Sequence, residues 1–322
     1  MVKYPHINIT IKIIGKICQK GKEIMSINDV ALHLHSTYSD GGHTVNELVE
    51  ELTGNSVKIA ALCDHDEIGG VKYFKDATEK VGIKSIPCFE LSTCYAKRFY
   101  VHILAYGFDI RKRAFIETAL RKNWQAHDDC FDETLEMINK KLRLHLTKEE
   151  IRQITNRMGN ANFTFPVFHH LNNNLGFDSA KLWELIYRDE KSPMNQLLLK
   201  GKLMTTEEGM EFITSIGATP VFAHPGFFAK YSLSGEGTTK QLERLFEIMV
   251  ELGLKGAEYF YPYPEEQKIM PFIEASRHLT KKHGLWELSG SDYHGSYKTN
   301  NCGIAMPGLS LAKALEFKSF CE

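Results

Sequence analysis

Short runs of apolar and β-branched residues alternate with amphipathic stretches from residue 29 onward. The runs that we interpret as strands are Ala31–His35, Lys58–Asp64, Ser85–Ser92, Tyr100–Phe108, Thr219–His224, Gly256–Tyr261 and Leu285–Ser289. Between them, stretches such as Gln241–Leu252 repeat large apolar residues at helical spacing. Alternation of this kind is typical of βα units, so the pattern predicts an α/β fold.

Residues 111–204 interrupt this alternation and predict several helices without strands. Thr147 followed by Glu150 is a capping-box start, and Thr205 with Glu208 repeats that signal where the alternation resumes. The predicted organisation is an N-terminal extension of unknown role (1–28), a main domain formed by 29–110 and 205–322, and a helical insertion that caps it (111–204).

The composition excludes some classes of protein. The chain has 322 residues, of which 43% are hydrophobic, and a formal net charge of -1, so it can bury a large core without offering a general surface for DNA. No apolar stretch approaches the roughly 20 residues of a membrane helix. The seven cysteines are scattered without a CxxC pair, which favours reduced thiols and predicts a cytoplasmic location.

The first candidate metal-binding motif is Leu32-His33-Leu34-His35-Ser36, which continues to Ser39-Asp40-Gly41. Side chains two apart on a strand share a face, so His33 and His35 point the same way. Two imidazoles on one face at a strand end form half of a divalent metal site.

Similar residues accompany most of the other predicted strands. They are His65 in Asp64-His65-Asp66, Glu90, His102, His224 in Ala223-His224-Pro225-Gly226, and Asp292 and His294 in Ser291-Asp292-Tyr293-His294-Gly295. Most lie at or just beyond the C-terminal end of a strand, where (β/α) barrels place catalytic residues. The alternative is that each is a separate buried or capping residue, which requires six independent coincidences, so we favour a single site.

The order of these motifs resembles the PHP (polymerase and histidinol phosphatase) family over about residues 30–110 and 205–296. The insertion is similar in size and placement to that of the subgroup with nucleotide phosphatases and a 5′–3′ exoribonuclease. The resemblance implies a distorted (β/α)7 TIM-like barrel that holds up to three metal ions at its C-terminal face. Similarity to that subgroup favours Mn²⁺, and the mixed imidazole and carboxylate ligands also suit Zn²⁺ or iron.

The resemblance also implies a ligand set for each ion. These sets are His33, His35, Glu90 and Asp292 for the first, Glu90, His102 and His224 for the second, and Asp40, His65 and His294 for the third. We expect Asp64 and Asp66 to orient imidazoles from behind the ligands. Glu258 resembles a recurrent acid of the family but could equally be an ordinary strand-end acid, and it stays outside the ligand set. For His169 and His170 we expect a core or helix-surface role.

The predicted reaction is hydrolysis of a phosphate ester of a nucleotide or of an RNA 5′ end, by attack of metal-bound hydroxide on phosphorus. The subgroup presents basic residues to phosphate early in its insertion, and Arg121-Lys122-Asn123 occupies the similar place here, where a solvated charged face is the alternative. Further on, where the subgroup often has arginine and histidine, this chain has Phe165-Pro166-Val167.

Three other functions remain open. A histidinol-phosphate phosphatase or another small-molecule phosphatase would share the chemistry. A non-catalytic metal-stabilised domain would be expected to lose ligands, and none is lost here. A metal-dependent amidohydrolase would share the histidines, but no lysine lies in a matching motif. The sequence leaves the oligomeric state open.

Overall fold

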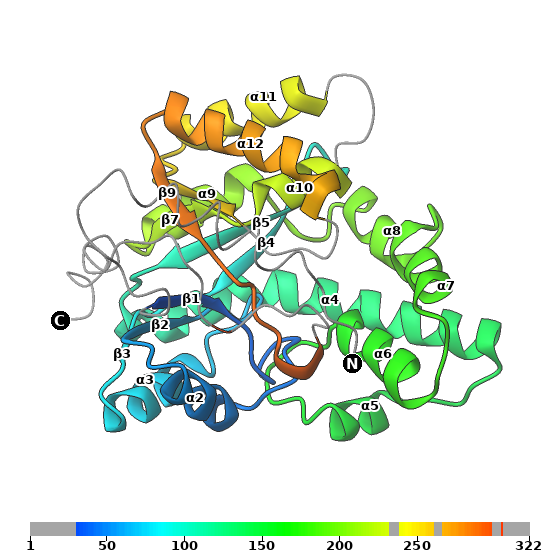
Figure 1. The fold of residues 1–322 in the computed structure, drawn as a ribbon. Helices are drawn as coiled ribbons and strands as arrows, with labels where there is room; N and C mark the ends of the chain where they lie inside the picture. The colour runs from blue at the N-terminus through cyan, green and yellow to red at the C-terminus, as the bar shows by residue number, and fades with distance from the viewer. Residues whose placement is uncertain (1–29, 232–237, 261–265, 298–303, 305–322) are drawn as a thin grey trace.

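The computed structural model describes residues 30–231, 238–260, 266–297 and 304 (Figure 1). The predicted N-terminal extension lies outside these residues, as do the last residue of the strand predicted at Gly256–Tyr261 and three of the cysteines.

Within the described residues, the strands form two sheets. The first has the order β1-β2-β3 and is parallel, and the second has the order β6-β4-β5-β7-β8-β9. The strands are β1 (Val30–Leu34), β2 (Ile59–Leu62), β3 (Lys84–Ser85), β4 (Glu90–Tyr95), β5 (Phe99–Tyr106), β6 (Met204–Thr205), β7 (Thr219–Phe222), β8 (Gly256–Phe260) and β9 (Trp286–Ser289). Isolated bridges, Leu34 to Tyr293 and His65 to Glu90, connect the two sheets.

Two features of the sheets differ from the predicted strands. The run predicted as Ser85–Ser92 is divided into β3 and β4, because Pro87 between them has no N–H with which to continue a ladder. Strand β5 also runs antiparallel to both β4 and β7. The antiparallel pairing of β4 and β5 has a local cause. Ala96 and Lys97 between them adopt φ of 51° and 53°, which suits a tight hairpin turn, and so short a connection cannot contain a crossover helix. The structure is therefore a mixed α/β fold.

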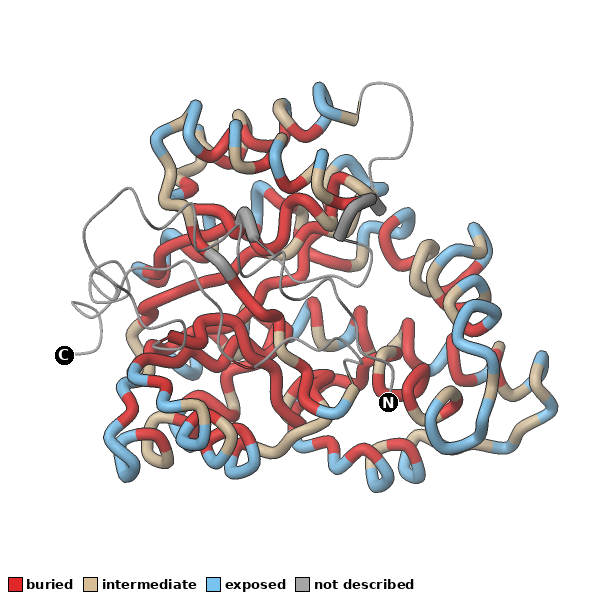
Figure 2. Tube along the Cα trace, viewed as in Figure 1, coloured by how far each residue is buried: buried red, intermediate tan, exposed pale blue. Residues whose placement is uncertain are grey.

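Helices cover the outer faces of both sheets, whose strands are almost wholly buried (Figures 1 and 2). The helices of the main domain are α2 (Val45–Gly54), α3 (Val71–Lys80), α9 (Thr206–Ser215), α10 (Pro225–Tyr231), α11 (Thr238–Glu251), α12 (Glu266–Lys282) and the short turn η4 (Gly295–Tyr297). Helices α2 and α3 pack on β1 and β2, whereas α9 and α11 pack on the second sheet. A third cluster joins the inner faces of both sheets and includes Leu32, Ala61, Leu104, Val221 and Leu288.

The insertion consists of helices joined by loops, and its last residue, Met204, begins β6. It contains η1 (Ile110–Lys112), α4 (Arg113–Leu142), α5 (Lys148–Ile154), α6 (Thr164–His169), η2 (His170–Asn174), α7 (Ser179–Trp183), η3 (Glu184–Arg188) and α8 (Pro193–Leu199). The capping boxes predicted at Thr147 and Thr205 both form. Helix α4 is shared between the two parts, because Ile116 packs into the main core whereas Phe131 packs into a separate core of the insertion.

No helix within the described residues combines the length and the apolar character needed to cross a membrane.

Candidate metal centre

Six strands and the residues that follow them bring all nine predicted ligands into one cluster. His33 is in β1, with His35 and Asp40 just beyond it; His65 follows β2, Glu90 begins β4, His102 is in β5, His224 follows β7, and Asp292 and His294 follow β9. Eight of these side chains belong to buried residues, and His102 is partly exposed.

The Glu90 carboxylate is the centre of this cluster, and its residue has no exposed surface. One oxygen, Oε2, lies 3.0 Å from His33 Nε2, 3.1 Å from His35 Nε2 and 3.4 Å from His65 Nδ1. The other oxygen, Oε1, lies 3.1 Å from His102 Nδ1 and 3.0 Å from His224 Nε2. A single carboxylate therefore faces five imidazoles, which is the arrangement expected of a bridging ligand.

Two further carboxylates extend the cluster on either side of His35 and His294. Asp292 Oδ1 is 3.1 Å from His35 Nε2 and 3.4 Å from His294 Nδ1. Asp40 Oδ1 is 3.2 Å from His294 Nε2, and its other oxygen, Oδ2, is 3.7 Å from His65 Nε2. The rings of His35 and His294 stack with their centroids 4.1 Å apart.

Three overlapping groups of ligand atoms lie close enough to surround an ion. They are His33, His35, Glu90 and Asp292; His65, Glu90 and His102; and His35, Asp40, His65 and His294. The first group is the set predicted for the first ion. The third group is the set predicted for the third ion, with His35 added. The second contains His65, whereas His224, which was expected there, contacts both Glu90 and His102.

The charges of the cluster stabilise one another. Burial alone would raise the pKa of Glu90, but the surrounding imidazoles, with His33 foremost, hold it well below its usual range. Burial would likewise raise the pKa of Asp40, and His294 and His65 lower it. Burial lowers the pKa of His65 to about 3, which keeps that ring neutral and able to donate a lone pair to a metal.

The donor set fits divalent cations. His35 Nε2 and His65 Nδ1 face Glu90 but are buried atoms that make no hydrogen bond to a described residue. Buried polar atoms usually have a partner, and a cation with mixed imidazole and carboxylate ligands would supply one.

Glu258 is a supporting residue that the sequence alone could not assign. Its carboxylate is buried and accepts hydrogen bonds from His33 Nδ1, at 3.0 Å, and from the backbone N–H of His224, also at 3.0 Å. These bonds fix the His33 ring so that its other nitrogen faces Glu90. Because Glu258 is 225 positions from His33, no local pattern could have revealed the contact.

Asp64 supports the site through a serine. It accepts hydrogen bonds from the backbone N–H and hydroxyl of Ser36, both at 2.8 Å, and from the hydroxyl of Ser39 at 2.7 Å. The Ser39 oxygen also lies 3.5 Å from His35 Nδ1. Asp64 thus contacts a candidate ligand, His35, only through Ser39. Its bonds to both serines hold the loop after β1 in place.

Asp66 contacts a different imidazole from those expected. It accepts hydrogen bonds from His127 Nε2 at 2.7 Å, from the amide of Asn123 at 2.8 Å and from the backbone N–H of Ser92 at 3.0 Å. Two of these donors lie on α4, so Asp66 anchors the insertion beside β4. His127 had no signal in the sequence because it lies in no motif.

The three residues predicted to contact substrate differ in their surroundings. Arg121 and Lys122 are exposed, and Lys122 forms an ion pair of 3.0 Å with Glu208 on α9. The Asn123 amide also donates to the Ser92 carbonyl, and its oxygen accepts from the Met204 backbone N–H. Because Asn123 is fully buried by these contacts, it serves α4 packing rather than substrate binding.

Three residues of the site adopt left-handed backbone conformations. The φ angles are 50° for Asp66, 33° for His224 and 46° for Asp292. Each costs about 1–3 kcal/mol in a residue other than glycine, and such strain concentrates at functional sites.

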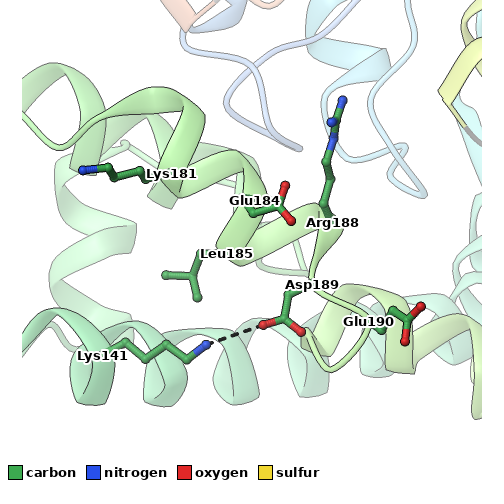
Figure 3. Close-up of a pocket in the computed structure, with 7 residues that line it drawn as sticks. All are labelled: Lys141, Lys181, Glu184, Leu185, Arg188, Asp189 and Glu190. Atoms are coloured by element: carbon green, nitrogen blue, oxygen red, sulfur yellow. Dashed lines mark ion pairs between the residues drawn. The ribbon is translucent and has the colours of Figure 1, made fainter.

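A pocket of about 530 Å³ lies elsewhere, on the insertion (Figure 3). Its lining residues are Lys141, Lys181, Glu184, Leu185, Arg188, Asp189 and Glu190. Lys141 and Asp189 form an ion pair of 3.6 Å across it. The pocket shares no residue with the cluster, and its balanced charges give no preference for a charged ligand.

The chain matches the PHP domain family over residues 31–128, which contain six of the nine clustered residues. It is 23% identical over 281 residues to a 3′,5′-nucleoside bisphosphate phosphatase of Chromobacterium violaceum, covering 83% of this chain and 87% of that protein. It is 42% identical over 78 residues to a 5′–3′ exoribonuclease of Haemophilus influenzae, covering 24% of this chain but only 28% of that relative's length.

The fold is similar to a solved structure described as an amidohydrolase from Chromobacterium violaceum with bound sulfate and no metal. The TM-score is 0.71 at 20% sequence identity, over 91% of this chain and 96% of that one. The resemblance to the PHP family predicted from the motifs is therefore confirmed.

Proposed function

We propose that this chain, which carries a PHP domain, is a metal-dependent phosphoesterase that hydrolyses a phosphate ester of a nucleotide or of an RNA 5′ end. The observation that carries the proposal is the buried cluster of six imidazoles around Glu90, Asp40 and Asp292. A cluster of this composition gives multiple divalent ions their ligands, and such ions activate water and neutralise phosphate oxygens.

The protein residues have separable roles in this proposal. Glu90 joins two of the ligand groups, and Asp40 with His294 forms the outer end of the third. Glu258 and the Asp64–Ser39 pair hold ligand imidazoles in their orientation. The three ligand groups support up to three ions. Manganese, which the resemblance to the nucleotide-phosphatase subgroup favours, is our proposed metal among those that these ligands suit.

Two finer features of the fold belong to the same proposal. The bridges between the two sheets and their shared inner core support a distorted seven-stranded barrel, capped by residues 111–204. A cytoplasmic location is supported by the described cysteines, Cys63, Cys88, Cys94 and Cys130, which are all free thiols and buried.

The substrate class rests on the relatives, which are named as a nucleoside bisphosphate phosphatase and an exoribonuclease. Each name refers to an enzyme that acts on phosphate esters of nucleosides. We propose that Arg121 contacts a phosphate that is not hydrolysed. Its side chain is exposed on α4, two residues before Asn123. The Asn123 amide donates to Asp66, so this part of α4 lies beside the loop that carries His65.

A substrate screen of the manganese-loaded protein tests the function. We expect activity on mononucleotides, nucleoside bisphosphates or short 5′-phosphorylated RNA, and little on histidinol phosphate. Preference for histidinol phosphate would favour the small-molecule phosphatase, and fully metal-loaded protein that hydrolyses none of these esters would favour the non-catalytic domain. Arg121→Ala should lose kcat/KM on bisphosphates but not on an aryl phosphate, which has no second anion.

A further inference from the structure

Arg157 is a buried cation that has no counter-ion among the residues that the structure describes. Its residue is 8% exposed, and no carboxylate of a described residue lies within ion-pair distance of its guanidinium. Its Nη1 makes no hydrogen bond to a described residue, and its Nη2 makes only a long one, of 3.4 Å, to the carbonyl of Gly41. Burial lowers the pKa of Arg157, but guanidinium groups stay protonated in proteins. A buried charge that cannot neutralise itself requires an anion.

The loop that carries Arg157 is fixed firmly to the main domain. Glu67 is buried, and its carboxylate accepts hydrogen bonds from the backbone N–H of Asn160 at 2.7 Å and from the Asn160 amide at 2.8 Å. The backbone N–H of Met158 donates to the Thr37 carbonyl at 2.8 Å. These bonds bracket Arg157, so its position is set by the packing of the insertion onto the ligand-bearing loop after β1.

The surroundings of Arg157 place it at the outer end of the metal centre. Its Nη2 contacts the carbonyl of Gly41, which directly follows Asp40 in the chain, and the backbone N–H of Gly42 donates to the His294 carbonyl at 2.9 Å. Tyr297 on η4 stacks on His169 of α6, with ring centroids 5.0 Å apart (Figure 1). Phe165 lies edge-on to His294, at 5.3 Å between centroids, so this part of the insertion covers the Asp40–His294 end.

We infer that Arg157 binds the phosphate group undergoing hydrolysis, at the Asp40–His294 end of the cluster. The inference rests on the proposed phosphoesterase function. A guanidinium matches phosphate geometry with paired N–H donors, and its unbonded Nη1 supplies such a donor.

The test compares Arg157→Met and Arg157→Lys with wild type, and Arg188→Met serves as the control because Arg188 is an exposed arginine of the same insertion. Three quantities are measured: metal content, the Kd for inorganic phosphate by calorimetry on manganese-loaded protein, and kcat/KM on an aryl phosphate. Arg157→Met should keep its metal but weaken both phosphate binding and kcat/KM on the order of 10- to 100-fold. Arg157→Lys should restore part of the loss, and Arg188→Met should match wild type.

Thermal unfolding separates this role from a structural one. Phosphate should raise the melting temperature of wild type but not of Arg157→Met, whose melting temperature without phosphate should equal or exceed that of wild type, since an unpaired buried charge is gone. If wild type is active but Arg157→Met binds phosphate as tightly as wild type, this inference alone is overturned. The same holds if Arg157→Met loses its metal, or if it melts at a lower temperature than wild type in the absence of phosphate. Metal-loaded wild type that neither binds phosphate nor hydrolyses an ester would overturn the proposed function as well.

Discussion

Replacing Glu90 by glutamine is the most informative test of the metal centre. The substitution keeps the size and shape of the side chain but removes its negative charge and one of the two acceptor oxygens. In the wild-type structure those oxygens face different imidazoles: Oε2 faces His33, His35 and His65, whereas Oε1 faces His102 and His224.

The size of the effect follows from the ligand groups. Two of the three groups contain Glu90, and only His35, Asp40, His65 and His294 form a group without it. Glu90→Gln should therefore lower the metal content from about three ions per chain towards one. Activity should fall by more than about 100-fold, because substitutions that act only behind the ligands cost about 10- to 100-fold.

The assay measures metal stoichiometry after manganese reconstitution together with kcat/KM on an aryl phosphate. Asp66→Asn is the matched buried comparison, since Asp66 bonds His127 rather than a ligand, and its losses should stay within about 10- to 100-fold. Glu79→Gln, on the exposed end of α3, is the surface control. Wild-type turnover and metal content in Glu90→Gln would refute the bridging assignment.

Three further outcomes follow from the structure. Glu258→Gln should weaken metal affinity by about 10- to 100-fold at unchanged fold, measured by chelator competition, because it loosens the imidazole that it orients; equal affinity would make Glu258 an ordinary strand-end acid. Gly159→Ala should cost about 1–3 kcal/mol in urea unfolding, since a Cβ there would lie 1.8 Å from the Tyr38 carbonyl oxygen, whereas Gly54→Ala, with open space around it, should not destabilise. In metal-free protein, burial lowers the pKa of His35, but the nearby carboxylates of Asp292 and Glu90 raise it from 6.5 to about 9. The protonated ring therefore stabilises the fold fully below pH 6.5, and this stabilisation is lost as the pH rises through 9. The urea midpoint should fall over that range, and a constant midpoint would contradict the shift.

The candidate ligands could be listed from the sequence because most belong to short motifs at strand ends, and the resemblance to the PHP family implied how they are grouped. A histidine pair two residues apart after an apolar run indicates one face of a strand end, and His33 with His35 confirms that reading in the structure. The capping boxes at Thr147 and Thr205 were equally local, since their bonds join residues three apart. The strand predicted at Ser85–Ser92 was wrong in its bounds, because composition favoured a continuous run across Pro87.

Only the tertiary structure could show which distant residues contact one another around the site. Glu258 bonds a histidine 225 positions away, Asp66 bonds His127 across 61 positions, and Arg157 meets Gly41 across 116. None of these contacts produces a period or a spacing, because each depends on which segments pack together after the strands have assembled. The sequence by itself thus determined which imidazoles and carboxylates stand at the strand ends, and these residue types make the cluster a candidate metal site. The packing of the insertion decided which of its polar residues are structural, such as Asn123, and which buried cation lacks a counter-ion among the described residues.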